Sequence, residues 1–126
     1  MEPIEFLKSA EALLEKESVA EVECRNAASR AYYSAYHSCL DLSKRYPTTN
    51  DNRVKKDVGM HEKLIQTLCE HQDVQVKSAG YSLRQVKTRR VKADYKLAQD
   101  FTLQDAKFTV NSVQKLLQEI GKIQPV

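Results

Sequence analysis

The stretch Ser29-Arg30-Ala31-Tyr32-Tyr33-Ser34-Ala35-Tyr36-His37 decides the fold of this chain. Small residues stand in it among three tyrosines, an arginine and a histidine, so a second backbone can come close while polar groups line the contact. Arg30 and His37 are seven residues apart and share one face of a helix, with Ser34 between them. We therefore predict a helix that carries a polar, ionisable stripe into close contact with its neighbours.

The helix that contains this stretch is predicted to be long. Ser18 and Glu21 form a candidate capping box at its start, and it continues to about Arg45 because Pro47 stops it. An apolar stripe follows the helical period and comprises Ala28, Tyr32, Ala35, Cys39 and Leu42.

Helical patterns also fill the rest of the chain, which has three glycines, three prolines and no long stretch that alternates with period two. Four further helices are predicted over about 3–16, 60–71, 78–97 and 102–121. Residues 47–59 are polar and predict a flexible loop. The predicted fold class is therefore all-α, an up-and-down helical bundle of about five helices in a single domain of residues 1–126.

The last predicted helix has the cleanest pattern. Thr102 and Asp105 form a variant of the capping box at its start, and Gly121 is the predicted C-cap. Its apolar residues recur at steps of three and four and comprise Leu103, Ala106, Val110, Val113, Leu117 and Ile120.

Composition sets outer bounds on function. The chain has no apolar run long enough for a transmembrane helix, and its acidic start lacks the basic and apolar blocks of a signal peptide. We therefore expect a cytoplasmic protein that does not interact with a membrane. Cys24, Cys39 and Cys69 are odd in number and far apart, which predicts free, mostly buried thiols.

Charge is unevenly distributed along a chain whose net charge is +3. Residues 1–23 hold seven glutamates against two lysines, whereas residues 84–96 hold six arginines and lysines against one aspartate. Such a basic run is either a solvated helix face or a site for a polyanion, because clustered cations release counterions when they meet phosphates. In the second case the candidate nucleic-acid contacts are Arg84, Lys87, Arg89 and Lys92.

The sequence has no glycine-rich phosphate loop, no zinc-binding His-Glu-x-x-His and no nucleophile elbow. Its three histidines are scattered, so we expect no metal site and no cofactor. Arg30 and His37 form the first candidate constellation. It is either a structural polar pair of a bundle helix or a centre for metal-free RNA cleavage, which needs a base for the 2′-hydroxyl, an acid for the leaving oxygen and a cation for the phosphate.

The second constellation is Arg90-Val91-Lys92-Ala93-Asp94-Tyr95, in which Arg90 and Asp94 are an i, i+4 pair. Inside a bundle, Asp94 must find a cation, because an unpaired buried charge is very costly. The two candidate cations are Arg90 and Arg30.

Together the two constellations resemble the HEPN superfamily of small helical domains, and most closely its uncharacterised prokaryotic branch. A long second helix in that branch reads Ser/Asn-Arg-Ala-Tyr-Tyr-x-Ala-Phe/Tyr-His, as residues 29–37 do here. A later helix reads Leu-Arg-x-x-Arg-x-x-Ala-Asp-Tyr or close to it. Here Leu83 and Arg84 precede Arg90 and the Ala93-Asp94-Tyr95 ending, with slightly longer spacing.

The resemblance implies a helical bundle that often forms homodimers. Many members of the superfamily are metal-independent endoribonucleases that serve as toxins, in phage defence or beside nucleotidyltransferase antitoxins. Their signature is an arginine followed, after four to six residues, by a histidine, usually on the later helix. Here Arg90 matches the arginine, but Tyr95 stands near the expected histidine, and Arg30 and His37 satisfy the spacing on the earlier helix instead.

Two functions follow as alternatives. The first is an RNA- or nucleotide-binding protein of a toxin–antitoxin or defence system, with possible endoribonuclease activity at a dimer interface. Its catalytic residues would be Arg30, His37 and Arg90, supported by a polar network of Tyr33, Asp94 and Tyr95. The second is a non-catalytic module that binds a partner protein such as a nucleotidyltransferase.

Overall fold

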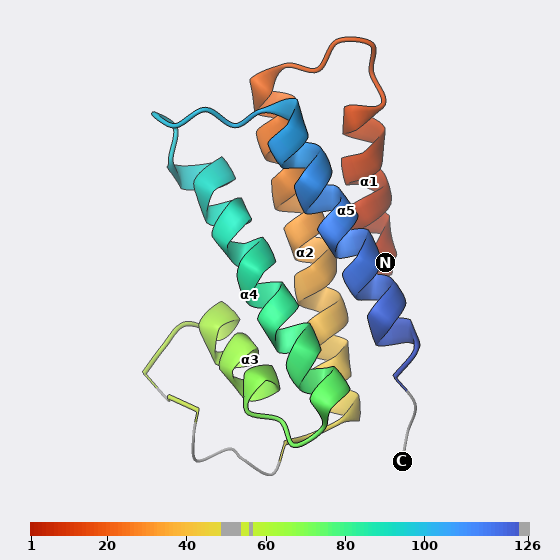
Figure 1. Ribbon diagram of the computed structural model, residues 1–126, viewed down its shortest axis with the longest axis vertical. Helices are drawn as coiled ribbons and strands as arrows, with labels where there is room; N and C mark the ends of the chain where they lie inside the picture. The colour runs from red at the N-terminus through yellow and green to blue at the C-terminus, as the bar shows by residue number, and fades with distance from the viewer. Residues whose placement is uncertain (49–53, 56, 124–126) are drawn as a thin grey trace.

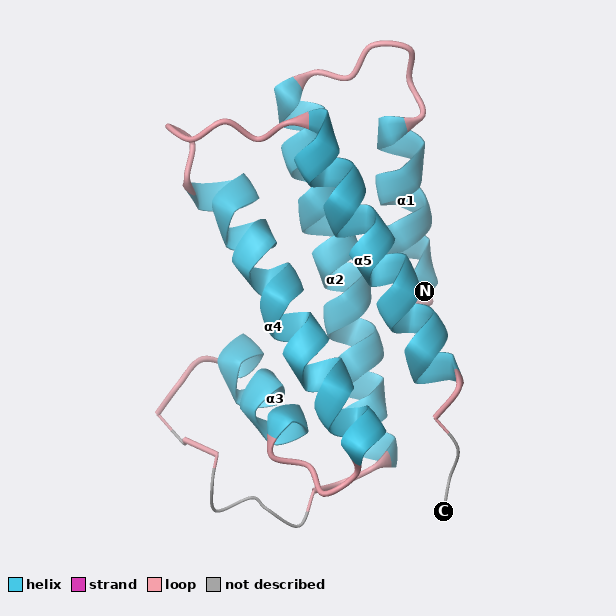
Figure 2. Cartoon of the chain, viewed as in Figure 1, coloured by secondary structure: helices cyan, strands magenta, loops and turns pink. Residues whose placement is uncertain are grey.

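A computed structural model of the protein describes residues 1–48, 54–55 and 57–123. Within these residues the chain forms an all-α bundle, which confirms the predicted fold class (Figures 1 and 2). Residues 49–53 and 56 of the predicted flexible loop 47–59 lie outside the described residues. The helices are α1 (Ile4–Leu14), α2 (Glu21–Arg45), α3 (Met60–Cys69), α4 (Val74–Tyr95) and α5 (Leu103–Gly121).

The long helix α2 is the centre of the bundle and contacts each of the other helices. The helices α1, α2, α4 and α5 run roughly along the long axis of the molecule, and the short α3 lies against one half of α4 (Figure 1). Every residue of the predicted apolar stripe of α2, from Ala28 to Leu42, is buried.

The start of α2 differs from the prediction. The helix begins at Glu21 with Ala20 as its N-cap residue, so the predicted opening at Ser18 is wrong. The reason is local: Glu23 accepts a hydrogen bond from the Ala20 N–H at 3.2 Å and another from Lys16, and these contacts cap the chain after Ser18.

The start of α4 also differs. The helix begins at Val74, one turn earlier than the predicted start near Ser78. The carboxylate of Asp73 accepts hydrogen bonds from the backbone N–H groups of Gln75 at 2.8 Å and Val76 at 3.2 Å. This side-chain cap satisfies two of the free donors at the helix start and makes the extra turn possible.

At α5 the predicted cap is confirmed. The Asp105 N–H donates to Thr102 Oγ1 at 3.1 Å, and the Thr102 N–H donates to Asp105 Oδ2 at 2.9 Å. At the other end Gly121 is the last helical residue and Lys122 is the C-cap, one position later than predicted. Gly121 has no left-handed conformation, so the end of α5 does not depend on glycine.

The close approach of α3 and α4 depends on Gly80. A Cβ atom at this position would lie 2.8 Å from the Cys69 backbone nitrogen and 2.8 Å from Leu68 Cβ. Only a residue without a side chain lets the two backbones come this close.

The three thiols are free, as predicted. Cys24 and Cys39 are buried and Cys69 is half-buried. Burial raises the pKa of Cys39 to about 12, so this thiol stays protonated. Among the described residues, no helix combines the length and the apolar character that crossing a membrane requires.

Candidate functional site

The two sequence motifs meet at the guanidinium group of Arg90, which α4 inserts among tyrosines of α2. The guanidinium carbon lies 5.6 Å from the ring centre of Tyr32, 5.5 Å from that of Tyr33 and 5.4 Å from that of Tyr95. Aromatic faces carry partial negative charge, so this arrangement stabilises the cation where water reaches it poorly.

The carboxylate of Asp94 holds Arg90 in this position. Arg90 Nε is buried and lies 2.8 Å from Asp94 Oδ2, as an ion pair whose angle is poor for a hydrogen bond. The Ser29 hydroxyl donates to the same carboxylate oxygen at 3.1 Å, and Arg90 Nη2 donates to the Tyr33 hydroxyl at 3.1 Å. Of the two candidate cations for Asp94, the structure therefore pairs Arg90 with it.

Charge and burial act in opposite directions on Arg90. Burial by itself would lower its pKa, but Tyr33 and Asp94 outweigh this and raise the pKa above the ordinary value. The side chain is a permanent cation. Its Nη1 atom makes no hydrogen bond with the described residues, which leaves the two N–H groups of Nη1 for a ligand.

A histidine that the sequence analysis did not select, His61, lies beside Arg90. It is the second residue of α3, and its ring stacks on that of Tyr36 with the centres 4.2 Å apart and the planes at 18°. Its Nδ1 atom lies 2.6 Å from the hydroxyl oxygen of Tyr32. The short helix α3 thus presents one imidazole to the tyrosines of α2.

The environment of His61 keeps its ring neutral. Burial lowers the pKa of His61, and the nearby positive charges of Arg90 and Lys87 lower it further. Burial also raises the pKa of the Tyr32 phenol, which therefore keeps its proton. The direction of the bond between Nδ1 and the Tyr32 hydroxyl depends on the tautomer of the neutral ring. When the proton is on Nδ1, the Nδ1–H donates to the hydroxyl oxygen, and the lone pair of Nε2, which makes no hydrogen bond with the described residues, is free to accept a proton.

A second imidazole, that of His37, also packs against Tyr36. Its ring packs edge-on against Tyr36 at 5.2 Å and stacks on Phe6 of α1 at 5.6 Å, with the planes at 11°. His37 is close enough for its charge to contribute to the lowered pKa of His61. Both histidines are half-buried, so each remains partly accessible to solvent.

We call this group of side chains the tyrosine–arginine cluster. Five of its residues were selected from the sequence as catalytic or supporting: three lie on α4 and two on α2. His61 and two further tyrosines of α2 complete it. Its members are Tyr32, Tyr33, Tyr36, His37, His61, Arg90, Asp94 and Tyr95.

Arg30 is separate from these contacts. Its guanidinium is exposed and donates from Nη1 to Ser9 Oγ of α1 at 2.7 Å. Although Arg30 and His37 lie on the same side of α2, the interactions of Arg30 are with α1, whereas those of His37 extend to Phe6 and Tyr36.

The basic run of α4 is divided between two sides of the helix. Arg84 and Lys87 both pair with Glu62 of α3, at 2.8 and 3.4 Å, and Arg90 pairs with Asp94. Burial would raise the pKa of Glu62, but hydrogen bonds from Arg84, Gln66 and Lys87 and the charge of Arg84 together outweigh this and lower it, so the carboxylate is charged at neutral pH. Arg89 points instead towards α5, where it covers the ring of Phe108 at 4.0 Å.

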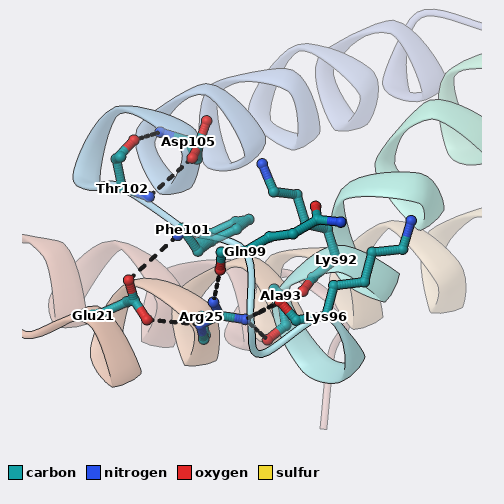
Figure 3. A network of polar contacts seen from close by, with 9 residues as sticks. All are labelled: Glu21, Arg25, Lys92, Ala93, Lys96, Gln99, Phe101, Thr102 and Asp105. Carbon is teal, nitrogen blue, oxygen red and sulfur yellow. Dashed lines mark hydrogen bonds and ion pairs between the residues drawn. The ribbon is translucent and has the colours of Figure 1, made fainter.

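A buried arginine, Arg25, fixes the end of α4 that carries the cluster (Figure 3). Its Nη1 donates to the carbonyl oxygens of Lys92 at 3.2 Å and Ala93 at 3.0 Å, and its Nη2 donates to that of Gln99. Its Nε bonds Glu21 Oε2 at 3.3 Å. Arg25 therefore ties the last turn of α4 and the following loop to the start of α2, and so positions Asp94 against Ser29.

No group of three or more histidine, cysteine, aspartate or glutamate side chains in the described part of the chain is arranged to hold a metal ion. Comparison of the chain with protein-family models, with curated proteins and with solved structures finds no match.

Proposed function

We propose that the protein is an RNA-binding domain of HEPN type that cleaves the phosphodiester backbone without a metal ion at the tyrosine–arginine cluster. The observation that carries this proposal is the pairing of a neutral, half-buried imidazole with a permanent cation: His61, oriented by Tyr32, beside Arg90. A neutral imidazole accepts a proton at pH 7, and a desolvated cation attracts the phosphate.

The proposed reaction uses the ribose 2′-hydroxyl as the nucleophile. One imidazole takes the 2′-hydroxyl proton, the 2′-oxygen bonds to phosphorus, the bond from phosphorus to the 5′-oxygen breaks, and a second group returns a proton to that oxygen. The products are a 2′,3′-cyclic phosphate and a 5′-hydroxyl. His61 is the proposed base because its lowered pKa leaves the ring neutral, and in the tautomer that donates from Nδ1 to Tyr32 the lone pair of Nε2 takes the proton. His37 is the proposed acid.

In this proposal Arg90 binds the phosphate through Nη1, while Tyr33, Tyr95 and Asp94 fix the direction of the guanidinium. Charge on the non-bridging oxygens grows as the 2′-oxygen attacks, so a cation held in place stabilises the transition state more than the ground state. Arg84 and Lys87 share the single carboxylate of Glu62, whereas Arg90 is the cation that lies among the tyrosines of the cluster.

A homodimer would complete the site. Beside the cluster, one stripe of α2 is open to solvent and includes Asn26, Arg30 and Asp41, with Tyr33 and His37 at its edge. A second copy that packs on this stripe would bring its own Arg30 to the cluster, which gives this exposed cation a role in phosphate binding. Light scattering of the purified protein, compared with Arg30→Glu, tests this assembly: a dimer that Arg30→Glu dissociates supports it, and a monomeric wild type contradicts it.

Cleavage itself is tested with structured RNA in the presence of EDTA. Wild type, His61→Asn and Arg90→Gln are compared with Lys63→Ala, which changes an exposed residue of the same helix as His61. We expect cleavage by wild type and Lys63→Ala and a loss of about a hundredfold or more in His61→Asn, because general base catalysis contributes about 10²–10⁴-fold. Equal cleavage by wild type and His61→Asn would contradict the proposal.

The second candidate function is a non-catalytic module that binds a partner protein. The contacts that the side chains of the cluster already make with one another favour it. Arg90 already contacts Asp94 and Tyr33, and His61 already bonds Tyr32. In a toxin–antitoxin setting the partner would be a protein such as a nucleotidyltransferase. Growth arrest on expression that His61→Asn relieves supports the enzyme, whereas arrest that persists in His61→Asn supports the binding module.

A further inference from the structure

A groove runs between α4 and α5, on the side of α4 that faces away from Glu62 and Asp94. The two helices are antiparallel neighbours in the bundle (Figure 1). The groove encloses about 300 Å³, which is at the lower end of the volume range of small-molecule sites. Side chains along it include Ser78, Ser82, Gln85, Arg89, Phe108 and Lys115.

The composition of this groove is unusual for a seam between two bundle helices. Apolar residues normally fill such a seam, but α4 contributes Ser78, Ser82 and Gln85 at successive turns. Phe108 of α5 stands at the end of this row and is 56% exposed. An aromatic ring and a line of hydroxyl and amide groups are thus left facing solvent together.

Phe108 forms a platform with Arg89. The guanidinium of Arg89 lies 4.0 Å from the ring centre and covers one part of the ring, and the large exposed fraction of Phe108 leaves the rest accessible. A flat, electron-rich heterocycle can stack on such a pair, because nucleobases stack on both aromatic rings and guanidinium planes.

The groove also offers cations. Arg89 and Lys115 form no ion pair with the described residues and are available to an anionic ligand. Two acids lie nearby: Glu119 at the far end of the groove, and Asp105, whose carboxylate already caps α5 through Thr102. The anionic part of a ligand would therefore settle between Arg89 and Lys115.

We propose that the α4–α5 groove binds a nucleotide unit, with the base stacked on Phe108 and Arg89, the phosphate near Arg89 and Lys115, and the sugar hydroxyls towards Ser82 and Gln85. A nucleotide combines the flat ring, the anion and the hydroxyl groups that the groove matches, whereas an acidic peptide would leave the Phe108 platform unused. The same unit could come from a free mononucleotide or from single-stranded RNA. The groove shares no residue with the tyrosine–arginine cluster, so nucleotide binding here and cleavage there can fail separately.

Titration calorimetry with AMP, and fluorescence anisotropy with a labelled ten-residue oligoadenylate, test this site. In Phe108→Ala we expect binding of the ligand to weaken about five- to a hundredfold, the range for loss of one base–aromatic stack. In Arg89→Ala we expect a loss of about tenfold, because hydrogen bonds to a charged group are lost. The matched control is Tyr81→Ala. Tyr81 is also an exposed aromatic residue, but it lies on α4 and does not line the groove.

Comparing AMP with the oligoadenylate shows whether the nucleotide unit comes from a free mononucleotide or from single-stranded RNA. Tight binding of AMP that the oligonucleotide does not exceed assigns the groove to a free nucleotide, and binding that requires the oligonucleotide assigns it to an RNA strand. Lys63→Ala should leave both affinities unchanged, because Lys63 is exposed and belongs neither to the groove nor to the tyrosine–arginine cluster. The proposal is overturned if neither ligand binds, if Phe108→Ala binds as wild type does, or if Tyr81→Ala loses as much affinity as Phe108→Ala.

Discussion

The Nδ1 atom of His61 and the hydroxyl oxygen of Tyr32 lie 2.6 Å apart, and this bond joins α3 to the centre of α2. The two residues are far apart in the sequence and belong to helices that otherwise share few contacts. The bond fixes the ring orientation of His61 and leaves Nε2 as the ring nitrogen open to a ligand.

The first prediction concerns the pH dependence of stability. Burial lowers the pKa of His61 in the folded protein below its ordinary value of 6.5, so the unfolded chain binds a proton more readily. The contribution of neutral His61 to the free energy of unfolding is therefore fully present above pH 6.5. It is lost as the pH falls from 6.5 towards the pKa of His61 in the folded protein. In urea unfolding between pH 5 and 8, the free energy of unfolding should fall more steeply on acidification for wild type than for His61→Asn. Parallel curves would contradict it.

The second prediction concerns the coupling between Arg90 and Asp94. Asp94→Asn and Arg90→Gln should each lower the free energy of unfolding by ~1–3 kcal/mol, because each leaves a largely buried charge without its partner. The double variant should lose clearly less than the sum of the two. A double-mutant cycle from denaturant unfolding measures this coupling, and additive losses would show that the pair does not act as a unit.

The third prediction concerns the approach of α3 to α4. Gly80→Ala should destabilise the protein by ~1–3 kcal/mol, because the new Cβ would lie 2.8 Å from the backbone nitrogen of Cys69. Gly121→Ala is the matched control, since nothing lies within 4 Å of its Cβ position. There the substitution should be neutral or stabilising by up to ~1 kcal/mol, because alanine favours the helix more than glycine does. Equal melting temperatures for the two variants would contradict the predicted clash.

The fourth prediction compares two arginines of α2. Arg25→Ala should lower the free energy of unfolding by ~2–4 kcal/mol, because several carbonyl oxygens around the end of α4 lose their donor. Arg30→Ala should change it by less than ~0.5 kcal/mol in the monomer, because the side chain is exposed and bonds only one hydroxyl among the described residues. Thermal unfolding of both variants at one protein concentration measures the difference, and a similar loss in both would refute the role assigned to Arg25.

Helical periodicity explains why the fold could be predicted from the sequence. The apolar stripe from Ala28 to Leu42 and the Thr102–Asp105 cap depend on residues at fixed short spacings, and both are found in the structure. The Arg90–Asp94 pair is found for the same reason, because residues four apart in a helix are neighbours.

His61 and Arg25 could not be found in this way. His61 reaches Tyr32 through the packing of α3, which no local spacing encodes, and the one available signal was its place at the start of a short helix. Arg25 bonds backbone carbonyl oxygens, and these have no side-chain signature in a sequence. The division of the basic run of α4 could not be predicted for a related reason: its residues point to different sides of the helix, so Arg84 and Lys87 meet Glu62 while Arg89 meets Phe108.

The central claim is that the neutral imidazole of His61, beside Arg90, cleaves RNA through the 2′-hydroxyl. The most direct measurement is mass spectrometry of the RNA ends after incubation with wild type and with His61→Asn in EDTA. We predict 2′,3′-cyclic phosphate and 5′-hydroxyl ends with wild type and intact RNA with His61→Asn. Intact RNA with wild type, or the same cyclic phosphate ends at the same rate with His61→Asn, would contradict the claim.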